Sequence, residues 1–549
     1  MLLGQLITYK KHKMKNIKYL LLSAVLVGFT ACNDEEDFED LLDNPTSEVV
    51  LPELITGSAD FSNYVAVGAS FTAGYTDGAL FMESQNNSFP NMLASKFANV
   101  GGGTFTQPLT EDNFGGLIAG GNPVIDPNTG ERLFTERLVF GGAGPVPLPS
   151  LNPAAMSTTD FALNNPTGPF SNLGIPGAKS VHLVAPGFGN IANFPNANPY
   201  AVRVTGNTPN ATILELAVAQ NPTFFTLSEV GGNDVLGYAI SGGESDINSP
   251  DYDPITPISQ FDYALNLLVT NLTANGAKGV IGNLPNITSL SHFTTVPHNP
   301  IPLDAATAGF LNGASAYGAY NAGLDGTLAF LIANPGQLAF FFPSTETMTS
   351  QELAEAEIAR RKISFTAGSG NAVVIFDESL TDLTLINAGL TNMRQATEDD
   401  LLVLPASNFI GTEAVPGNPQ TVNGVAIPLA DKWVLTPEEQ DEIATATQAY
   451  NASISAAVNS NGLALVDLNS ILEQASTTGI MFDDYIMNTN LVSGGLISLD
   501  GVHPTARGYA LMANSFLKKI DEIYETNFEA SGNLVKAGDY PTNYPIVFQ

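Results

Sequence analysis

Short apolar runs alternate with longer helical patterns along most of this chain. Strands that are buried on both faces of a sheet read as almost continuous apolar runs, and such runs occur at 63–68, 180–184, 223–230, 278–283 and 463–468. Helical patterns are clearest at 259–274, 437–458 and 505–524. Strands and helices that alternate in this way form βα units around a parallel sheet. The sequence therefore predicts an α/β fold with a central parallel sheet.

The helix predicted at 437–458 has a clear start signal. Thr436 can cap the free backbone N–H groups, Pro437 suits the first turn, and Glu439 completes a capping box. This combination predicts that the helix begins directly after Thr436.

The chain is longer than one ordinary domain, with 549 residues. Two stretches rich in Gly, Pro and Asn show only patchy periodicity, and we interpret them as insertions in a single α/β domain. The predicted organisation is a signal peptide at 1–31, an acidic tether at 32–58, a main domain at 59–527 with insertions near 101–170 and 291–430, and a C-terminal tail at 528–549.

A serine in the setting of a nucleophile follows the first predicted strand. Ser70 lies between Gly68 and Gly74, and these glycines allow a tight turn and close packing. Because the strand precedes it directly, Ser70 is expected at the carboxyl end of that strand, where open α/β sheets hold their ligands. Thr72 stands where the α/β-hydrolase elbow requires glycine, so that fold is disfavoured.

A serine hydroxyl needs help to act as a nucleophile at neutral pH. A histidine must take its proton, and an acid must hold that histidine in the right tautomer. Asp500 and His503 have suitable spacing, so a serine hydrolase is the leading hypothesis. Of the remaining histidines, His12 lies in the presequence. The other three lack acid or metal-ligand spacing, and we interpret them as packing or loop residues: His182, His292 and His298.

Four segments in order resemble the sequence blocks of the SGNH, or GDSL, hydrolase family. The turn containing Ser70 resembles block I, and residues 172–178 resemble block II. Residues 231–234 match the Gly-x-Asn-Asp pattern of block III, and residues 500–504 match the Asp-x-x-His pattern of block V. This resemblance implies a three-layer α/β/α sandwich with a flavodoxin-like parallel sheet.

The resemblance also implies a role for each matching residue. Ser70 would be the nucleophile, His503 the general base, and Asp500 the acid that orients the histidine. The backbone N–H groups of Ser70 and Gly177 and the side-chain amide of Asn233 would form the oxyanion hole. An acyl-enzyme would form and be hydrolysed by water, and no metal or organic cofactor is expected.

One position departs from the family pattern. Ala69 replaces the aspartate that precedes the nucleophile in the family, which affects support of the nucleophile turn and not the triad acid itself. Taken singly, the motifs also have plain structural readings, since Ser70 could cap a helix, Asn233 could bridge a turn, and Asp500 with Gly501 could form a turn. Their ordered combination favours the hydrolase interpretation.

The acidity of the chain limits its partners. It has 20 Lys and Arg against 54 Asp and Glu, and a net charge of −34. Such a field repels nucleic acid and anionic surfaces, so nucleic acid is not an expected partner. The one cysteine, Cys32, cannot form an internal disulfide, and with five histidines it leaves no Cys/His zinc cluster.

The N-terminal segment has the pattern of a secretory signal. Lys15 and Lys18 precede an uncharged run at 19–31 that ends in small residues before Cys32. The run is shorter than the about 20 residues that span a bilayer, and Met14 is the better translation start. The ending resembles a bacterial lipobox, which implies cleavage before Cys32 and lipid attachment there. An ordinary cleaved signal is the alternative.

An acidic block follows the cysteine at 33–40. Like charges repel one another, so this block is expected to form a disordered tether. It resembles the surface-export signal of Bacteroidetes lipoproteins, which implies an outer-membrane lipoprotein of the cell envelope that is exposed at the surface. A solvated linker with no sorting role is the alternative.

Together these features predict a secreted, lipid-anchored esterase or lipase. Its substrate would be a small-molecule or lipid carboxylic ester, and its membrane contact would be the lipid on Cys32. A carbohydrate acetyl esterase is one alternative. A surface lipoprotein that binds without turnover is another, and Ala69 keeps it open. Aromatic runs at 310–320 and 340–342 could line an acyl groove or simply form core.

Overall fold

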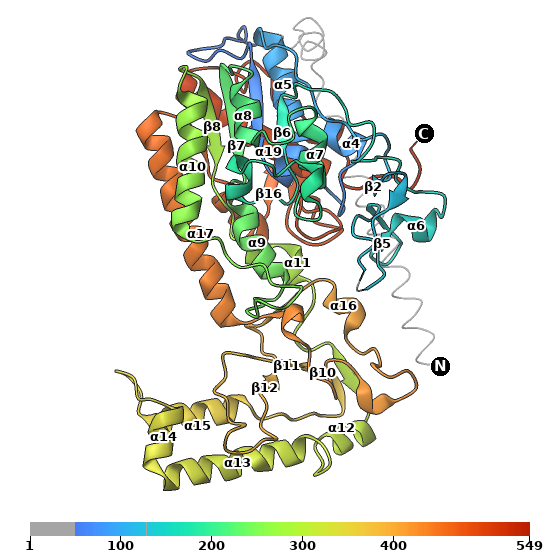
Figure 1. The fold of residues 1–549 in the computed structure, drawn as a ribbon, viewed down its shortest axis with the longest axis vertical. Helices are drawn as coiled ribbons and strands as arrows, with labels where there is room; N and C mark the ends of the chain where they lie inside the picture. The colour runs from blue at the N-terminus through green and yellow to red at the C-terminus, as the bar shows by residue number, and fades with distance from the viewer. Residues whose placement is uncertain (1–49, 128, 549) are drawn as a thin grey trace, which may run out of the picture. The chain divides into compact units, whose positions relative to one another are not determined.

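A five-stranded parallel sheet forms the centre of the fold (Figure 1). The computed structural model describes residues 50–127 and 129–548. Across the sheet the strands are β15 (Ala464–Val466), β8 (Lys278–Gly282), β7 (Phe224–Ser228), β1 (Tyr64–Gly68) and β6 (Asn172–Gly174). β1 and β7 are buried along their whole length, which explains their continuous apolar sequence. The predicted α/β fold with a central parallel sheet is confirmed.

The order of the strands creates a switch point at β1. Counted along the chain, the sheet order is second, first, third, fourth and fifth, so β1 lies between β6 and β7. Gly68 pairs with Gly174 of β6 and with Ser228 of β7. The loops that follow these three strands therefore start at the same edge of the sheet. Ligands of open α/β sheets bind at such a point.

Two groups of helices flank the sheet. α19 (Ala506–Tyr524) packs against α5 (Phe89–Phe97) and β15, while α10 (Ile258–Thr273) packs against α17 (Pro437–Asn461) and α8 (Ile213–Val218). In Figure 1, α8 and α10 lie side by side in front of the strands. Thr505 starts α19 by accepting a hydrogen bond from the Gly508 N–H at 3.0 Å, as a helix N-cap does.

α17 begins directly after Thr436, as predicted, although the Thr436 side chain accepts no capping hydrogen bond. The backbone N–H of Thr436 donates to the carboxylate of Glu439 at 2.6 Å, and Pro437 is the first helical residue. The helix continues beyond the predicted end to Asn461. Gly462 ends it in the left-handed conformation, with φ at 62°, which glycine adopts without steric cost.

One predicted strand is wrong. Residues 180–184 form a 3₁₀ helix, η2 (Ser180–Val184), instead of joining the sheet. The backbone N–H and the hydroxyl of Ser180 both donate to the Asp234 carboxylate, at 2.7 and 2.6 Å. His182 Nδ1 accepts the Lys179 N–H at 3.1 Å. These local bonds favour a helical turn, and the sheet edge is instead β6, which the sequence analysis did not predict as a strand.

The other elements lie mainly in the connecting stretches, and most of them are short, although α13 has 17 residues. Helices among them are α3 (Ser70–Ala73), α4 (Met82–Asn86), α6 (Leu148–Leu151), α7 (Pro199–Thr205), α9 (Gly232–Ile240), α11 (Ser291–Thr294), α12 (Ala305–Leu311), α13 (Tyr317–Ala333), α14 (Pro335–Phe341), α15 (Ser350–Arg360), α16 (Ala406–Phe409) and α18 (Leu468–Thr477). Antiparallel pairs join β2 (Ile118–Ala119) to β3 (Asn122–Pro123), β4 (Leu138–Phe140) to β5 (Pro145–Pro147), β9 (Ile301–Leu303) to β10 (Gly368–Asn371), β11 (Val374–Phe376) to β12 (Met393–Gln395), β13 (Leu401–Leu402) to β14 (Val434–Leu435), and β16 (Ile480–Phe482) to β17 (Tyr485–Met487).

The predicted signal peptide, Cys32 and the acidic block at 33–40 lie outside the described residues. Within residues 50–127 and 129–548, every helix is too short or too polar to cross a membrane. After α19 the chain packs back onto the core, with Phe528, Val535 and Tyr544 buried.

Candidate active site

The predicted nucleophile turn, residues 68–74, is held by glycines with no room for a side chain. Ser70 is the first residue of α3, directly after β1, and is 6% exposed. A Cβ atom at Gly68 would lie 2.2 Å from Thr72 Oγ1 and 2.4 Å from the Ser228 carbonyl oxygen. Gly74 closes the turn with φ at 87°, a value that favours glycine. Ser70 therefore sits where a strand end meets a helix start.

Asp500 and His503 form a hydrogen-bonded pair. His503 Nδ1 lies 2.9 Å from Asp500 Oδ2. A carboxylate only accepts hydrogen bonds, so the proton of the neutral imidazole belongs on Nδ1. Nε2 is then left with a free lone pair. This is the tautomer in which a histidine can accept the proton of a serine hydroxyl.

The Asp500 carboxylate is surrounded by donors. Oδ1 accepts hydrogen bonds from the backbone N–H groups of Val502 and His503, both at 2.9 Å, and from Ser498 Oγ at 3.0 Å. Oδ2 also accepts the Gly78 N–H at 2.8 Å. Burial raises the pKa of Asp500, but the charge of His503 and these hydrogen bonds outweigh it and hold that pKa well below its ordinary value. Asp500 therefore remains ionised at neutral pH.

Hydrogen bonds join the loop after α3 to the loop that carries Asp500. The Asp77 N–H donates to Ser498 Oγ at 3.0 Å, and the Leu499 N–H donates to Asp77 Oδ1 at 3.1 Å. Thr76 Oγ1 donates to the Pro504 carbonyl at 2.9 Å. These contacts hold two segments that lie more than four hundred residues apart in the sequence, so the nucleophile turn and the histidine are positioned together.

The imidazole of His503 lies beside the nucleophile turn. Its ring centroid is 4.7 Å from that of Tyr75 and 5.7 Å from that of Phe71, the residue after Ser70. Within residues 50–127 and 129–548, no hydrogen bond joins Ser70 Oγ to His503. Hydrogen bonds between catalytic groups are often long without substrate and tighten when it binds. The Asp500–His503 pair thus lies beside the turn, and the Ser70 hydroxyl makes no hydrogen bond to His503.

The predicted oxyanion donors come from loops after three adjacent strands. Among the described residues, the backbone N–H groups of Ser70 and Gly177 donate no hydrogen bond. Asn233 Nδ2 donates to the Ala178 carbonyl at 3.0 Å, which uses one of its two amide hydrogens. The Asn233 side chain therefore contacts the loop that carries Gly177, and one of its hydrogens is free for a ligand.

Sequence reasoning missed Glu229, which supports the nucleophile turn. Both oxygens of its buried carboxyl group lie within hydrogen-bond distance of the Phe71 N–H, at 2.7 and 2.8 Å. Burial raises the pKa of Glu229 well above its ordinary value, although hydrogen bonds from Phe71, Thr72 and Ala69 oppose this shift. Glu229 thus supplies a carboxyl group beside the turn of Ala69, where the family pattern that the sequence resembles has an aspartate. Its position as the one acid in the apolar run 223–230 was the available signal.

His292 supports the other side of the site. It is buried, and its backbone N–H donates to the Gly501 carbonyl at 2.9 Å. Burial lowers the pKa of its imidazole, although nearby Asp500 opposes this, so the ring is neutral at pH 7. The sequence predicts a packing or loop role for His292. Its contact with the loop of Asp500 could not be predicted from spacing, because the two residues lie far apart in the sequence.

An apolar cavity adjoins Ser70. Its volume is about 100 Å³, and almost all of its lining surface is apolar. It extends between α18 and α19, and the lining includes Phe71, Val235, Leu236, Leu290, Leu472, Leu496 and Met512. The aromatic runs at 310–320 and 340–342 do not line it. In those runs Tyr317, Tyr320 and Phe342 are buried, whereas Phe340 is 72% exposed.

Comparison with known proteins found no relatives. No protein-family model matches the chain, and no curated protein or solved structure is significantly similar to it.

Proposed function

We propose that this chain is a serine esterase of the SGNH type that hydrolyses carboxylic esters. The observation that carries the proposal is the Asp500–His503 pair, bonded at 2.9 Å beside the turn of Ser70. The strand order supports a flavodoxin-like α/β/α sandwich, and the four segments that resemble SGNH blocks occur in family order along the sequence. The stretches near 101–170 and 291–430 would be insertions in that sandwich.

The proposed reaction begins when Ser70 Oγ attacks the ester carbonyl. His503 Nε2 takes the serine proton, and ionised Asp500 stabilises the imidazolium that forms. Negative charge on the carbonyl oxygen would be met by the N–H groups of Ser70 and Gly177 and by the free amide hydrogen of Asn233. His503 then protonates the departing alcohol. Water, activated by the same imidazole, releases the acid from the acyl-enzyme.

The cavity favours an ester with an apolar acyl chain. A chain of methylene groups would be stabilised there by about 0.8 kcal/mol per buried CH₂, whereas a sugar would lose hydrogen bonds to water. Ser70 borders this cavity directly. The apolar lining therefore supports an acyl esterase or lipase over a carbohydrate acetyl esterase.

A chain-length series tests the proposal. The purified full-length protein should hydrolyse p-nitrophenyl esters, with higher kcat/KM for medium acyl chains than for acetate. Ser70→Ala should abolish this turnover, while Ser407→Ala, a matched change at an exposed serine, should leave it intact. Equal turnover by Ser70→Ala would refute the mechanism. A preference for acetylated sugars over all acyl chains would favour the carbohydrate esterase.

The envelope location is part of the same proposal. The lipobox-like sequence before Cys32 supports a lipid anchor, and the block at 33–40 supports export to the outer-membrane surface. In a bacterial host, the wild-type protein should partition with membranes, and Cys32→Ser should release it into the soluble fraction. Retention of the Cys32→Ser protein in membranes after signal removal would contradict the anchor.

A binding protein without turnover is the second candidate. The observations that favour it are the absence of a Ser70–His503 hydrogen bond among the described residues and the contact of Asn233 with Ala178. Such a protein would hold an acyl chain in the cavity and leave the ester intact. It would bind the ester substrates of the chain-length series with no release of p-nitrophenol.

A further inference from the structure

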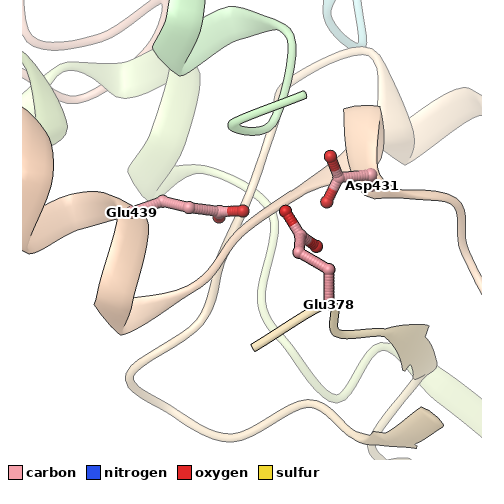
Figure 2. Close-up of side chains that lie close together, drawn as sticks. All are labelled: Glu378, Asp431 and Glu439. Atoms are coloured by element: carbon pink, nitrogen blue, oxygen red, sulfur yellow. The ribbon is translucent and has the colours of Figure 1, made fainter. Parts of the chain in front are cut away.

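Three carboxylates converge at the end of α9 that is remote from Asn233. Glu378 follows β11, Asp431 begins the 3₁₀ helix η6 (Asp431–Trp433), and Glu439 lies in the first turn of α17. One oxygen from each lies within 4.8 Å of the others. Figure 2 shows the three side chains reaching from separate segments toward a common centre.

Glu439 points a buried, unpartnered oxygen into this group. The residue is only 6% exposed. Its Oε2 accepts the Thr436 N–H at 2.6 Å. Its Oε1 has no hydrogen-bond partner among the described residues, although a buried anionic oxygen without a partner is costly. This oxygen is therefore available to coordinate a cation, because no hydrogen-bond donor occupies it.

No basic side chain neutralises the three carboxylates within the part of the chain that the structure describes. The nearby Arg360 pairs with Asp377 and Glu438, and Lys432 pairs with Asp251. An adjoining pocket adds more negative charge, since it is lined by Glu244, Glu378, Glu438, Glu439 and Glu442. The site thus concentrates negative charge and would attract a small cation.

We propose that Glu378, Asp431 and Glu439 bind one Ca²⁺ ion. All three ligands are oxygens, which select a hard cation over zinc or copper. Calcium–oxygen distances of about 2.3–2.6 Å allow two ligand oxygens to lie up to about 5 Å apart, and the separation in this cluster is within that limit. Water would complete the coordination shell.

The ion would join segments that are distant in the sequence. Glu378 and Asp431 lie in the segment of the chain before α17, and Glu439 lies in α17 itself. α17 packs on α10 and α9. The loop after α9 is also close, because a Cβ atom at Gly243 would lie 2.4 Å from the carboxyl carbon of Glu439. The role is therefore structural. It is separate from the Ser70 reaction, for which no metal is expected.

Calorimetric titration of the full chain with CaCl₂, after dialysis against EGTA, tests the site. The wild-type protein should show a specific site, and calcium should raise its melting temperature. Glu439→Gln keeps an acceptor for the Thr436 N–H and should weaken binding by about 100-fold or more, since even outer-shell changes cost roughly 10- to 100-fold. Asp441→Asn, a matched change at an exposed acid of the same helix, should bind as the wild type does.

Terbium luminescence gives a reading local to the cluster. Trp433 is the only tryptophan and lies two residues after Asp431, so excitation of its indole should sensitise Tb³⁺ bound at the site. Calcium should displace this emission, and Ser70→Ala should retain it. Glu378→Gln, a change at an exposed residue that should not prevent folding, should abolish it. The proposal is overturned if the wild-type protein gives no calcium-displaceable emission, or if Glu378→Gln matches the wild type in both assays.

Discussion

Asp500 and Asp431 are both shielded carboxylates, but their neighbours differ. Asp500 accepts hydrogen bonds from three backbone N–H groups and a hydroxyl, and it pairs with His503. Asp431 faces Glu378 and Glu439. The pKa of Asp500 is held low against the effect of burial. Burial raises the pKa of Asp431 well above its ordinary value, assisted by its hydrogen bond to Glu378 and by neighbouring negative charge.

The two environments suit these carboxyl groups to different roles. Donors around Asp500 keep it charged, and this charge can stabilise an imidazolium in the proposed reaction. Carboxylates that face one another without donors are unstable as a charged group, and either protons or a cation must relieve the repulsion. Burial alone therefore does not identify the role of an acid. The donors and cations around it do.

The largest expected effect comes from removing the charge of Asp500. Asp500→Asn should lower kcat for ester hydrolysis by about 10⁴-fold, because the histidine loses its tautomer and its counter-charge. Steady-state kinetics would measure this, with the exposed Asp484→Asn as the matched control. A loss of less than about ten-fold in a folded Asp500→Asn protein would be inconsistent with the proposed role of this carboxylate.

Variants of Glu229 test whether an uncharged hydrogen-bond acceptor is enough to hold the nucleophile turn in place. Glu229→Ala should lower kcat by about 100-fold, since the Phe71 N–H loses its partner and the turn loosens. Glu229→Gln preserves an acceptor and should recover most of this loss while KM changes little. If both variants fell equally in kcat, the carboxyl group itself would be needed, and a positioning role would be wrong.

The raised pKa of Asp77 predicts that the stability of the protein depends on pH. Burial raises its pKa to about 7 from 3.8, with the charge of Asp500 adding to the effect, while the Leu499 N–H and the Arg137 charge oppose it. Because the pKa of Asp77 is raised, its protonated form favours the folded state. This contribution to the free energy of unfolding is complete below about pH 4 and is lost as the pH rises through about 7. Asp77→Asn removes this titration and suits the left-handed backbone at this position, where φ is 53°.

Urea unfolding at two pH values would measure the effect. The free energy of unfolding of Asp77→Asn minus that of the wild type should be about 2 kcal/mol larger at about pH 8 than at about pH 5. A constant difference between the two proteins across this range would show that Asp77 does not titrate there.

The smallest effect is expected at the acidic cluster. In EGTA, Asp431→Asn should increase the free energy of unfolding by about 1 kcal/mol, because the amide, unlike the carboxyl group with its raised pKa, needs no proton to be uncharged beside Glu378 and Glu439. With saturating calcium the sign should reverse, since the wild type alone keeps its full ligand set. Thermal melts in both buffers would measure this. Without a reversal, the carboxylates would be sharing protons instead of a cation.

Local sequence signals predicted much of the fold and of the site. Continuous apolar runs identified four strands of the sheet, and the spacing of Asp500 and His503 indicated a pair that the structure brings together. The run at 180–184 failed because side-chain hydrogen bonds to Asp234 and His182 decided its conformation. β6 has only one apolar side chain among its three residues, Leu173, so no apolar run marks it in the sequence.

Contacts between distant segments could not be predicted from one sequence. Glu229 meets Phe71 across 158 positions, and the hydrogen bond from Gly78 to Asp500 spans 422. The cluster of Glu378, Asp431 and Glu439 has no motif spacing, because its members come from three separate segments. Such sites depend on how the chain folds back on itself.

Labelling with a serine-reactive fluorophosphonate tests the central claim most directly. We predict that the full-length protein is modified at Ser70, identified by mass spectrometry of the peptide that contains it, and that His503→Ala slows this labelling strongly. The reagent reports an activated serine whatever the natural substrate is. If the folded wild-type protein is not labelled at Ser70, or if His503→Ala is labelled as fast as the wild type, the site does not activate this serine, and the binding protein becomes the better account.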